Sequence, residues 1–223
     1  ILDPQQNTVL NVDLETKEGK ISVGGDKIKG STLVAGTDNN FYVLSKEKIQ
    51  AIAKDGKILG EQETKDLGEV KDIFGFSGSA YLLGKEQVYK FSGGSVLTQS
   101  NYLSQPAADL ADSVALAIDG SVWVLTKDGD ILKYTRGVKD YFAIQGLDKP
   151  LSEPIALFTS KDCENLYVLD RKNTRVAVFN KKGEYLASYF WSGIAGATNL
   201  AVLEDLKKIF LLTGSRIYEI DLR

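Results

Sequence analysis

The segment "NLYVLDRKNTRVAVFNKKGEYLASYF", residues 165–190, is the most regular part of the chain. It contains three short runs of alternating apolar and β-branched or aromatic residues, separated by turns that contain Asp, Asn or Gly. Runs of this kind are typical of consecutive β-strands joined by hairpins. The apolar run "PIALFTS" at 154–160 comes directly before them. Together the four runs predict an antiparallel sheet of four strands made from one continuous piece of chain.

The second strand of this set recurs along the chain. An aromatic residue inside it occurs every 39 to 44 residues, at Tyr42, Tyr81, Trp123, Tyr167 and Phe210. A repeat of about 40 residues built only from strands is the signature of a β-propeller with four strands in each blade. We interpret the aromatic series as core between blades.

The other three strands of each blade follow the same order. A first strand with small residues is predicted at 31–37, 72–78, 113–120, 154–160 and 199–205, and a third strand at 48–56, 87–94, 130–137, 175–183 and 216–222. A more polar fourth strand is predicted at 57–64, 138–145 and 184–190. A polar fourth strand suits the edge of a blade that faces water.

Both ends of the chain lie inside this pattern. Residues 1–3 align with 168–170, in the second strand of a blade, and 216–222 align with a third strand. We therefore expect an all-β, six-bladed β-propeller of four-stranded antiparallel blades, incomplete in the first and last blades, with the missing strands upstream of Ile1. The predicted blades of this single domain are about 1–29, 30–68, 69–108, 109–150, 151–196 and 197–223. The alternative is a five-bladed ring with a decorated terminus.

Composition excludes several classes of function. The chain has 223 residues, a formal net charge of −3 and no histidine. The acidic pI of about 5.2 does not favour a nucleic-acid partner, which usually needs a clustered basic face. Without histidine, Ser-His-Asp and Cys-His catalysis and His-ligated zinc are excluded. The single cysteine, Cys163, is predicted to be a surface thiol in a turn rather than a nucleophile.

The run "NTRVAVFNKKGEYLASYF" resembles an NHL repeat, through Asn173, Arg175, Phe179, Gly183 and Tyr185. The other blades keep the strand order and lose the Asn-x-Arg pattern, so the chain is similar to the broader NHL-like group of six-bladed propellers. That group includes protein-binding platforms, sensor domains, RNA binders and metal-dependent enzymes. The resemblance implies a structural role for the arginine, which reaches back across a turn toward backbone or carboxylate groups such as Asp170.

The sequence pattern of the strands also resembles that of the C-terminal propellers of bacterial PPM-type phosphatase-like proteins. This resemblance implies that the chain is a sensor or interaction domain of a larger bacterial protein, whose parent chain is anchored in a membrane. It favours the extracytoplasmic side of that membrane and otherwise leaves the compartment open. We expect no membrane contact by the segment itself.

A first candidate site is an aromatic surface for a protein, peptide or small ligand. Trp191 lies in the Gly-containing loop "FWSGIAGATN", and Tyr102 and Tyr141 lie in equivalent segments of other blades. Exposed aromatic residues beside polar turns are typical of binding hot spots. The alternative for Trp191 is that its ring folds back and covers the end of a blade.

A second candidate site is a calcium-binding collar. Oxygen-bearing side chains stand at or just before the first strands, and a calcium ion needs several such ligands. The candidates are Asp72, Asp112, Glu153 and Asn199. The alternative is that Ser, Asp and Asn at strand starts serve local hydrogen bonding.

These observations predict a non-catalytic binding module without a cofactor. The alternative is a calcium-dependent, lactonase-like hydrolase that uses the carboxylates of the collar.

Overall fold

The computed structural model describes all residues from Ile1 to Arg223 and is built from β-strands with four short 3-10 turns. Its strands form six antiparallel sheets, each made of strands that follow one another in the chain. This arrangement is the fold class predicted from the repeat, a six-bladed β-propeller. The first and last sheets have three strands and the other four have four. No helix is long and apolar enough to cross a membrane.

The chain divides into two compact units, and each is described by itself. The first unit comprises residues 1–84 and 88–102 and holds three sheets. Its first sheet has the order β1-β2-β3 and its other two are β4-β5-β6-β7 and β11-β10-β9-β8. The strands are β1 (Leu2–Asp3), β2 (Thr8–Val12), β3 (Gly19–Gly24), β4 (Ser31–Gly36), β5 (Asn40–Ser45), β6 (Lys48–Ala53), β7 (Ile58–Glu63), β8 (Asp72–Phe76), β9 (Ser79–Leu83), β10 (Val88–Ser92) and β11 (Thr98–Asn101). The 3-10 turns are η1 (Gly25–Ile28) and η2 (Lys65–Leu67).

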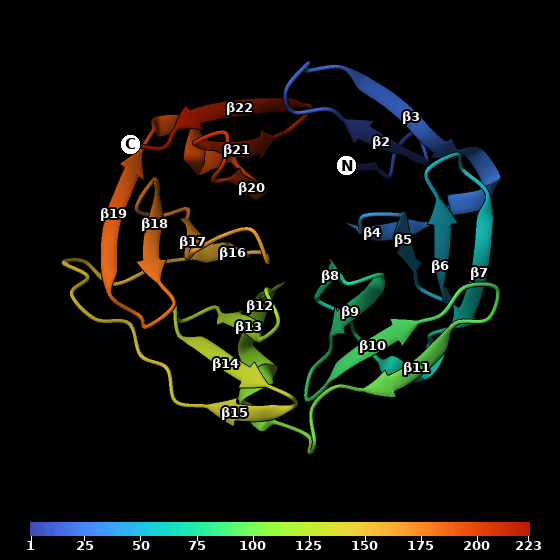
Figure 1. Ribbon diagram of the computed structural model, residues 1–223, viewed down its shortest axis with the longest axis horizontal. Coiled ribbons are helices and arrows are strands. Elements are labelled where there is room, and N and C mark those ends of the chain that lie inside the picture. Colours follow the sequence, from blue (N-terminus) through green and yellow to red (C-terminus); the bar gives the residue numbers. More distant parts are fainter. The chain divides into compact units, whose positions relative to one another are not determined.

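The second unit comprises residues 85–87 and 103–223 and holds the remaining three sheets. They are β12-β13-β14-β15, β16-β17-β18-β19 and the three-stranded β20-β21-β22 (Figure 1). The strands are β12 (Ser113–Ile118), β13 (Val122–Thr126), β14 (Ile131–Thr135), β15 (Val138–Asp140), β16 (Pro154–Phe158), β17 (Asn165–Asp170), β18 (Arg175–Asn180), β19 (Tyr185–Phe190), β20 (Asn199–Leu203), β21 (Lys208–Thr213) and β22 (Arg216–Asp221). The 3-10 turns η3 (Ala108–Asp112) and η4 (Ser192–Gly196) each precede a first strand.

The register repeats from blade to blade. In three blades the pairing of the first and second strands carries an irregularity at the same place, between Ser31 and Leu33, between Ser113 and Ala115, and between Pro154 and Ala156. A bulge at an equivalent position in several blades supports a common structural unit, because bulges are conserved features of a strand pair.

The aligned aromatic residues lie in the core, as predicted. Tyr42, Tyr81, Trp123, Tyr167 and Phe210 are all buried. Two of their hydroxyl groups also join neighbouring blades, because Tyr42 donates to the backbone oxygen of Gly78 at 2.7 Å and Tyr167 donates to Glu204 at 2.7 Å. In both cases the acceptor lies at the turn between the first two strands of the next blade. The aligned aromatic residues therefore contribute both to the packing of the core and, at these two tyrosines, to hydrogen bonds between blades.

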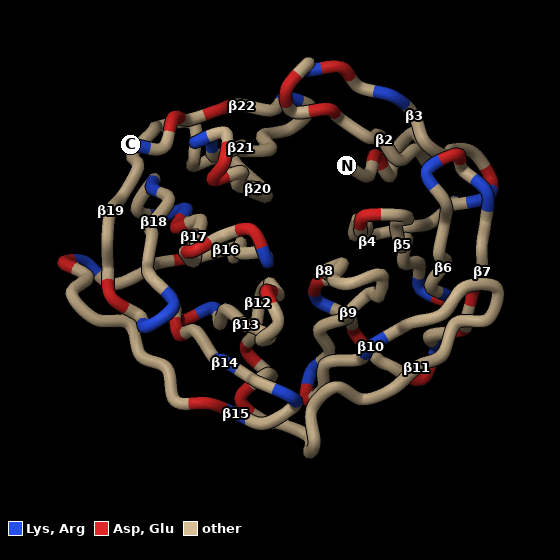
Figure 2. Tube along the Cα trace, viewed as in Figure 1, with Lys and Arg blue, Asp and Glu red and all other residues tan.

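Charged residues of both signs are interleaved along the trace of each unit (Figure 2). Many of them form exposed pairs, such as Lys48 with Glu61 and Lys127 with Asp112. Such pairs contribute little to stability, so this surface is a solvated one.

Candidate binding site on the fourth blade

The fourth blade departs from the predicted strand pattern at its outer edge. A strand was predicted over 138–145, and this prediction is wrong beyond Asp140, where β15 ends. β15 pairs only with Lys133, Tyr134 and Thr135 of β14. Ile131 and Leu132, the first two residues of β14, therefore have no strand beside them on this side.

The chain leaves β15 because it pairs with the next blade instead. Gln145 donates its backbone N–H to Gly183 at 2.8 Å, and its carbonyl accepts from the N–H of Tyr185 at 2.9 Å. This parallel bridge holds the linker against the β18–β19 hairpin, which the yellow segment after β15 passes in Figure 1. The approach is close enough that a Cβ on Gly183 would lie 2.0 Å from the carbonyl oxygen of Ala143. A glycine is needed there for space as well as for its positive φ of 94°.

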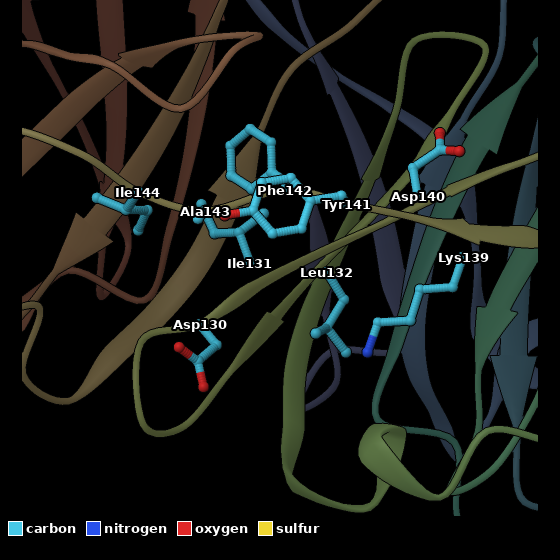
Figure 3. A pocket seen from close by; sticks show the side chains of 9 residues that line it. All are labelled: Asp130, Ile131, Leu132, Lys139, Asp140, Tyr141, Phe142, Ala143 and Ile144. Carbon is cyan, nitrogen blue, oxygen red and sulfur yellow. The ribbon is translucent and has the colours of Figure 1, made fainter.

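A pocket of about 420 Å³ lies where β14 and the departing chain separate (Figure 3). Its lining comes from the start of β14, the end of β15 and the four residues that follow. The lining residues are Asp130, Ile131, Leu132, Lys139, Asp140, Tyr141, Phe142, Ala143 and Ile144. One wall is fixed in place, because the ring of Phe142 packs edge-on against the buried Trp123, with centroids 5.1 Å apart.

Tyr141 is the most exposed large apolar side chain of the protein, with 91% of its surface accessible. It lines the pocket next to Phe142, which is half-buried (Figure 3). A tyrosine offers a large apolar face and a hydrogen-bonding hydroxyl at low conformational cost, which makes it an efficient contact residue. Among the three aromatic residues predicted to bind a partner, Tyr141 is the one that stands free at a cavity.

Two lysines near the pocket are neutralised by carboxylates. Lys139 binds Asp109, and Lys133 lies 3.9 Å from Asp140. Burial alone would raise the pKa of Asp109, but hydrogen bonds from Lys139 and from the hydroxyl of Tyr134 outweigh it and lower that pKa. Asp130 makes no ion pair through its carboxylate. The charge that the pocket lining leaves uncompensated is therefore negative.

Trp191 lies over its own loop. Its indole packs against Tyr218, with ring centroids 4.8 Å apart, and joins the buried cluster between the last two blades. A Cβ on Gly193 would lie 2.2 Å from the indole ring, so the ring covers the backbone of the loop directly. This arrangement corresponds to the alternative in which Trp191 covers the end of a blade.

Tyr102 is half-buried at the end of β11 in the first unit. Its ring packs edge-on against Tyr81 with centroids 5.7 Å apart. Tyr102 thus extends the apolar packing of its own blade. The three aromatic residues therefore have different surroundings.

The oxygens of the predicted calcium collar have local partners. Asp112 lies 2.5 Å from Lys127, and Glu153 lies 3.7 Å from Arg171 and 3.6 Å from Lys172. Asp72 and Asn199 each accept a hydrogen bond from the N–H of the following residue, at 2.8 Å. Within neither unit do three acidic, cysteine or histidine side chains gather around a point where a metal ion could bind. Calcium binding by these residues stays the alternative to a module without a cofactor.

Arg175 has the structural role that the resemblance implied. It is buried, and its Nε donates to the buried carboxylate of Asp170 at 2.8 Å. Its terminal nitrogens reach Asp148 at 3.3 Å and the backbone oxygen of Lys149. Asp170 also accepts from the backbone N–H of Ser152 at 2.9 Å. The pair therefore ties the long linker of the fourth blade to the fifth blade.

Cys163 is buried rather than exposed, so the prediction of a surface thiol is wrong. Its sulfur lies 3.3 Å from the hydroxyl of Ser160 and 3.9 Å from the backbone oxygen of Val202 in the next blade. The turn was correctly placed, but it packs against the neighbouring blade. Burial raises the pKa of this thiol, which favours the unreactive protonated form.

Sequence reasoning missed Ile131, Leu132, Phe142 and Ile144 as residues of a site. The step from Trp123 to Tyr167 is the longest in the aromatic series. That step of 44 residues exceeds the next one, from Tyr167 to Phe210, by only one residue. The pocket arises from the early end of β15 at Asp140, which repeat length does not reveal.

Comparisons with known proteins identify the fold alone. No protein-family model and no curated protein match the chain, so membership of the NHL-repeat family is not confirmed. Among solved structures, the chain is similar to virginiamycin B lyase from Staphylococcus aureus, with 13% identity, a TM-score of 0.58, and coverage of 99% of this chain and 75% of the lyase. It is also similar to the computationally designed Ika8 protein, with 12% identity, a TM-score of 0.61, and coverage of 97% and 66%.

Proposed function

We propose that this protein is a non-catalytic binding domain that holds a peptide or small ligand in the pocket beside Tyr141. The observation that carries the proposal is the position of Tyr141, which is 91% exposed at the rim of a pocket of about 420 Å³. Pockets that bind ligands are concave and mainly apolar, with a few polar groups that set orientation. Ile131, Leu132 and Phe142 supply the apolar walls, and Asp130 supplies a polar group.

The chemistry of the chain supports binding rather than catalysis. The sequence has no histidine, and its one cysteine is buried. Of the two carboxylates in the pocket lining, Asp140 accepts a hydrogen bond from Thr135 at 2.5 Å and lies near Lys133. Hydrolysis by carboxylates commonly uses two carboxyl groups in different roles. Asp130 is the only carboxylate of the pocket lining without a partner, so the pocket does not supply such a pair.

A fragment screen tests this proposal. Aromatic and aliphatic fragments are screened by ligand-observed NMR against the wild-type protein, Tyr141→Ser and Phe190→Ser. Phe190 is the matched control, because it is an aromatic residue of the same unit, 69% exposed, that does not line the pocket. We expect hits that weaken at least five-fold in Tyr141→Ser and are unchanged in Phe190→Ser. Fragments whose affinity is unchanged by both substitutions would contradict the proposal.

A further inference from the structure

We propose that the ligand of this pocket is an extended peptide segment of a partner protein, in which a Lys or Arg lies close to an apolar side chain. This inference rests on the proposed function and specifies the class of ligand. The segment would add to the open edge of β14, in the place where the predicted fourth strand would have continued beyond Asp140.

The backbone of β14 supports strand addition. The carbonyl of Asp130 accepts from the N–H of Thr126 at 2.9 Å, so the backbone of Asp130 faces β13. Backbone groups of successive strand residues alternate between the two edges, which directs the N–H and C=O of Ile131 to the other edge. β15 pairs with β14 only from Lys133 onward. Ile131 therefore presents an unpaired donor and acceptor to the pocket, as sheets that bind peptides by strand addition do.

The walls of the pocket fit one large apolar side chain of such a peptide. Ile131, Leu132 and Ile144 line it together with the rings of Phe142 and Tyr141 (Figure 3). The Phe142 ring is held by its contact with Trp123, so this wall is already formed before a ligand binds. Tyr141 has no ring partner and can pack against the peptide. Burial of an apolar side chain in a preformed site is the main source of affinity available here.

The charges around the pocket favour a cationic residue in the peptide. Lys139 is neutralised by Asp109, and Asp140 is neutralised by Lys133, whereas the carboxylate of Asp130 has no counter-ion. In an extended peptide, residues i and i+2 point to the same side about 7 Å apart. A Lys or Arg near the apolar anchor can therefore reach Asp130 at the pocket rim. An acidic residue at that position would be repelled by the same carboxylate.

A selection from a random peptide library displayed on phage tests the inference. The wild-type protein is the bait, and enriched peptides are synthesised and titrated against wild type, Tyr141→Ser, Asp130→Asn and Asp128→Asn. Asp128 is the matched control, because it lies in the same turn and does not line the pocket. We expect enriched peptides with Lys or Arg within three positions of an apolar residue. Their affinity should fall about ten-fold in Tyr141→Ser and about five-fold in Asp130→Asn, and less than two-fold in Asp128→Asn.

The outcomes separate this inference from the proposed function. Peptides that depend on Tyr141 and carry no cation, or bind equally well to Asp130→Asn, would overturn the inference and leave a binding pocket beside Tyr141 intact. Peptides with no dependence on Tyr141 would overturn both. Strand addition has its own readout, because methylating one backbone nitrogen of the peptide should reduce affinity about ten-fold at a single position. An N-methyl scan without such a position would overturn strand pairing at Ile131.

Discussion

Arg175 and Asp170 form an ion pair in which both side chains are buried, with Nε of the arginine 2.8 Å from Oδ2 of the aspartate. The pair also contacts the backbone of the linker between the fourth and fifth blades, at Lys149 and Ser152. The remaining oxygen and nitrogens of both side chains are thus hydrogen-bonded, which a buried charge requires. This linker is the same segment whose departure from β15 opens the pocket, so the pair supports one side of the candidate site.

Arg175→Met should destabilise the protein by about 3–5 kcal/mol, because it leaves the carboxylate of Asp170 buried without its partner. The measurement is the free energy of unfolding from denaturant titration. Arg216→Met is the matched control, since Arg216 lies exposed on β22, and we expect little change. A double variant, Arg175→Met with Asp170→Leu, should recover part of the loss. Equal effects at Arg175 and Arg216 would show that the pair does not hold the linker.

The protein should lose stability at alkaline pH through its buried tyrosines. Burial raises the pKa of Tyr134 and Tyr167, and hydrogen bonds to Asp109 and Glu204 raise it further. The pKa of each phenol is higher in the folded state than its unfolded value of about 10. Their stabilising contribution is therefore complete below about pH 10 and is lost as pH rises through the folded-state pKa.

Absorbance at 295 nm and circular dichroism, followed together from pH 9 to 13, check this prediction. We expect part of the phenolate signal to appear only as the strand signal is lost. In Tyr134→Phe with Tyr167→Phe, that late part of the absorbance change should shrink. Complete ionisation of all tyrosines while the strand signal remains native would show that the prediction is wrong.

The two candidate aromatic residues of the second unit should respond differently to truncation. Trp191→Ala removes an indole that packs on Tyr218 and on the cluster between the last two blades, so we expect a loss of about 2–4 kcal/mol. Tyr141→Ala removes a side chain that is 91% exposed, and the expected change is within about 0.5 kcal/mol. The measurement is the thermal unfolding of both variants, compared with that of the wild-type protein. A large loss in Tyr141→Ala would make this residue structural.

Calcium should not raise the melting temperature. The carboxylates of Asp112 and Glu153 have cationic side chains within 4.0 Å, and a metal ion would have to displace them. Ligand binding to the folded state stabilises it by mass action, so a site would appear as a shift of the melting curve. The measurement compares millimolar calcium with a chelator. A rise that disappears in a variant with both Asp72→Asn and Glu153→Gln would restore the calcium site and the hydrolase alternative.

The repeat made most of the fold predictable. Short strands with an aromatic residue at a fixed place, such as those around Trp123 and Tyr167, specify a local hairpin and its buried face together. The predicted first strands all start at the residues where β4, β8, β12, β16 and β20 begin. Local sequence pattern and tertiary packing agree at these positions, and because of this agreement the strands can be predicted from the sequence.

The pocket was less predictable because it arises from a competition between two pairings. Residues 141–144, Tyr-Phe-Ala-Ile, form an apolar run that suits a strand, yet Gln145 pairs with the β18–β19 hairpin and draws the chain away from β14. Local sequence does not determine whether this segment pairs with the edge of β14 or with the β18–β19 hairpin. Cys163 shows the same limit, since its turn was correctly placed while its burial depends on Val202 of the next blade.

The most direct test of the central proposal is hydrogen–deuterium exchange of the wild-type protein with and without a peptide from the selection. We expect protection at Ile131 and over residues 141–144, with Tyr141→Ser losing that protection at the same peptide concentration. Protection confined to other segments, or a bound peptide that leaves residues 130–144 unchanged, would contradict a binding site on the fourth blade.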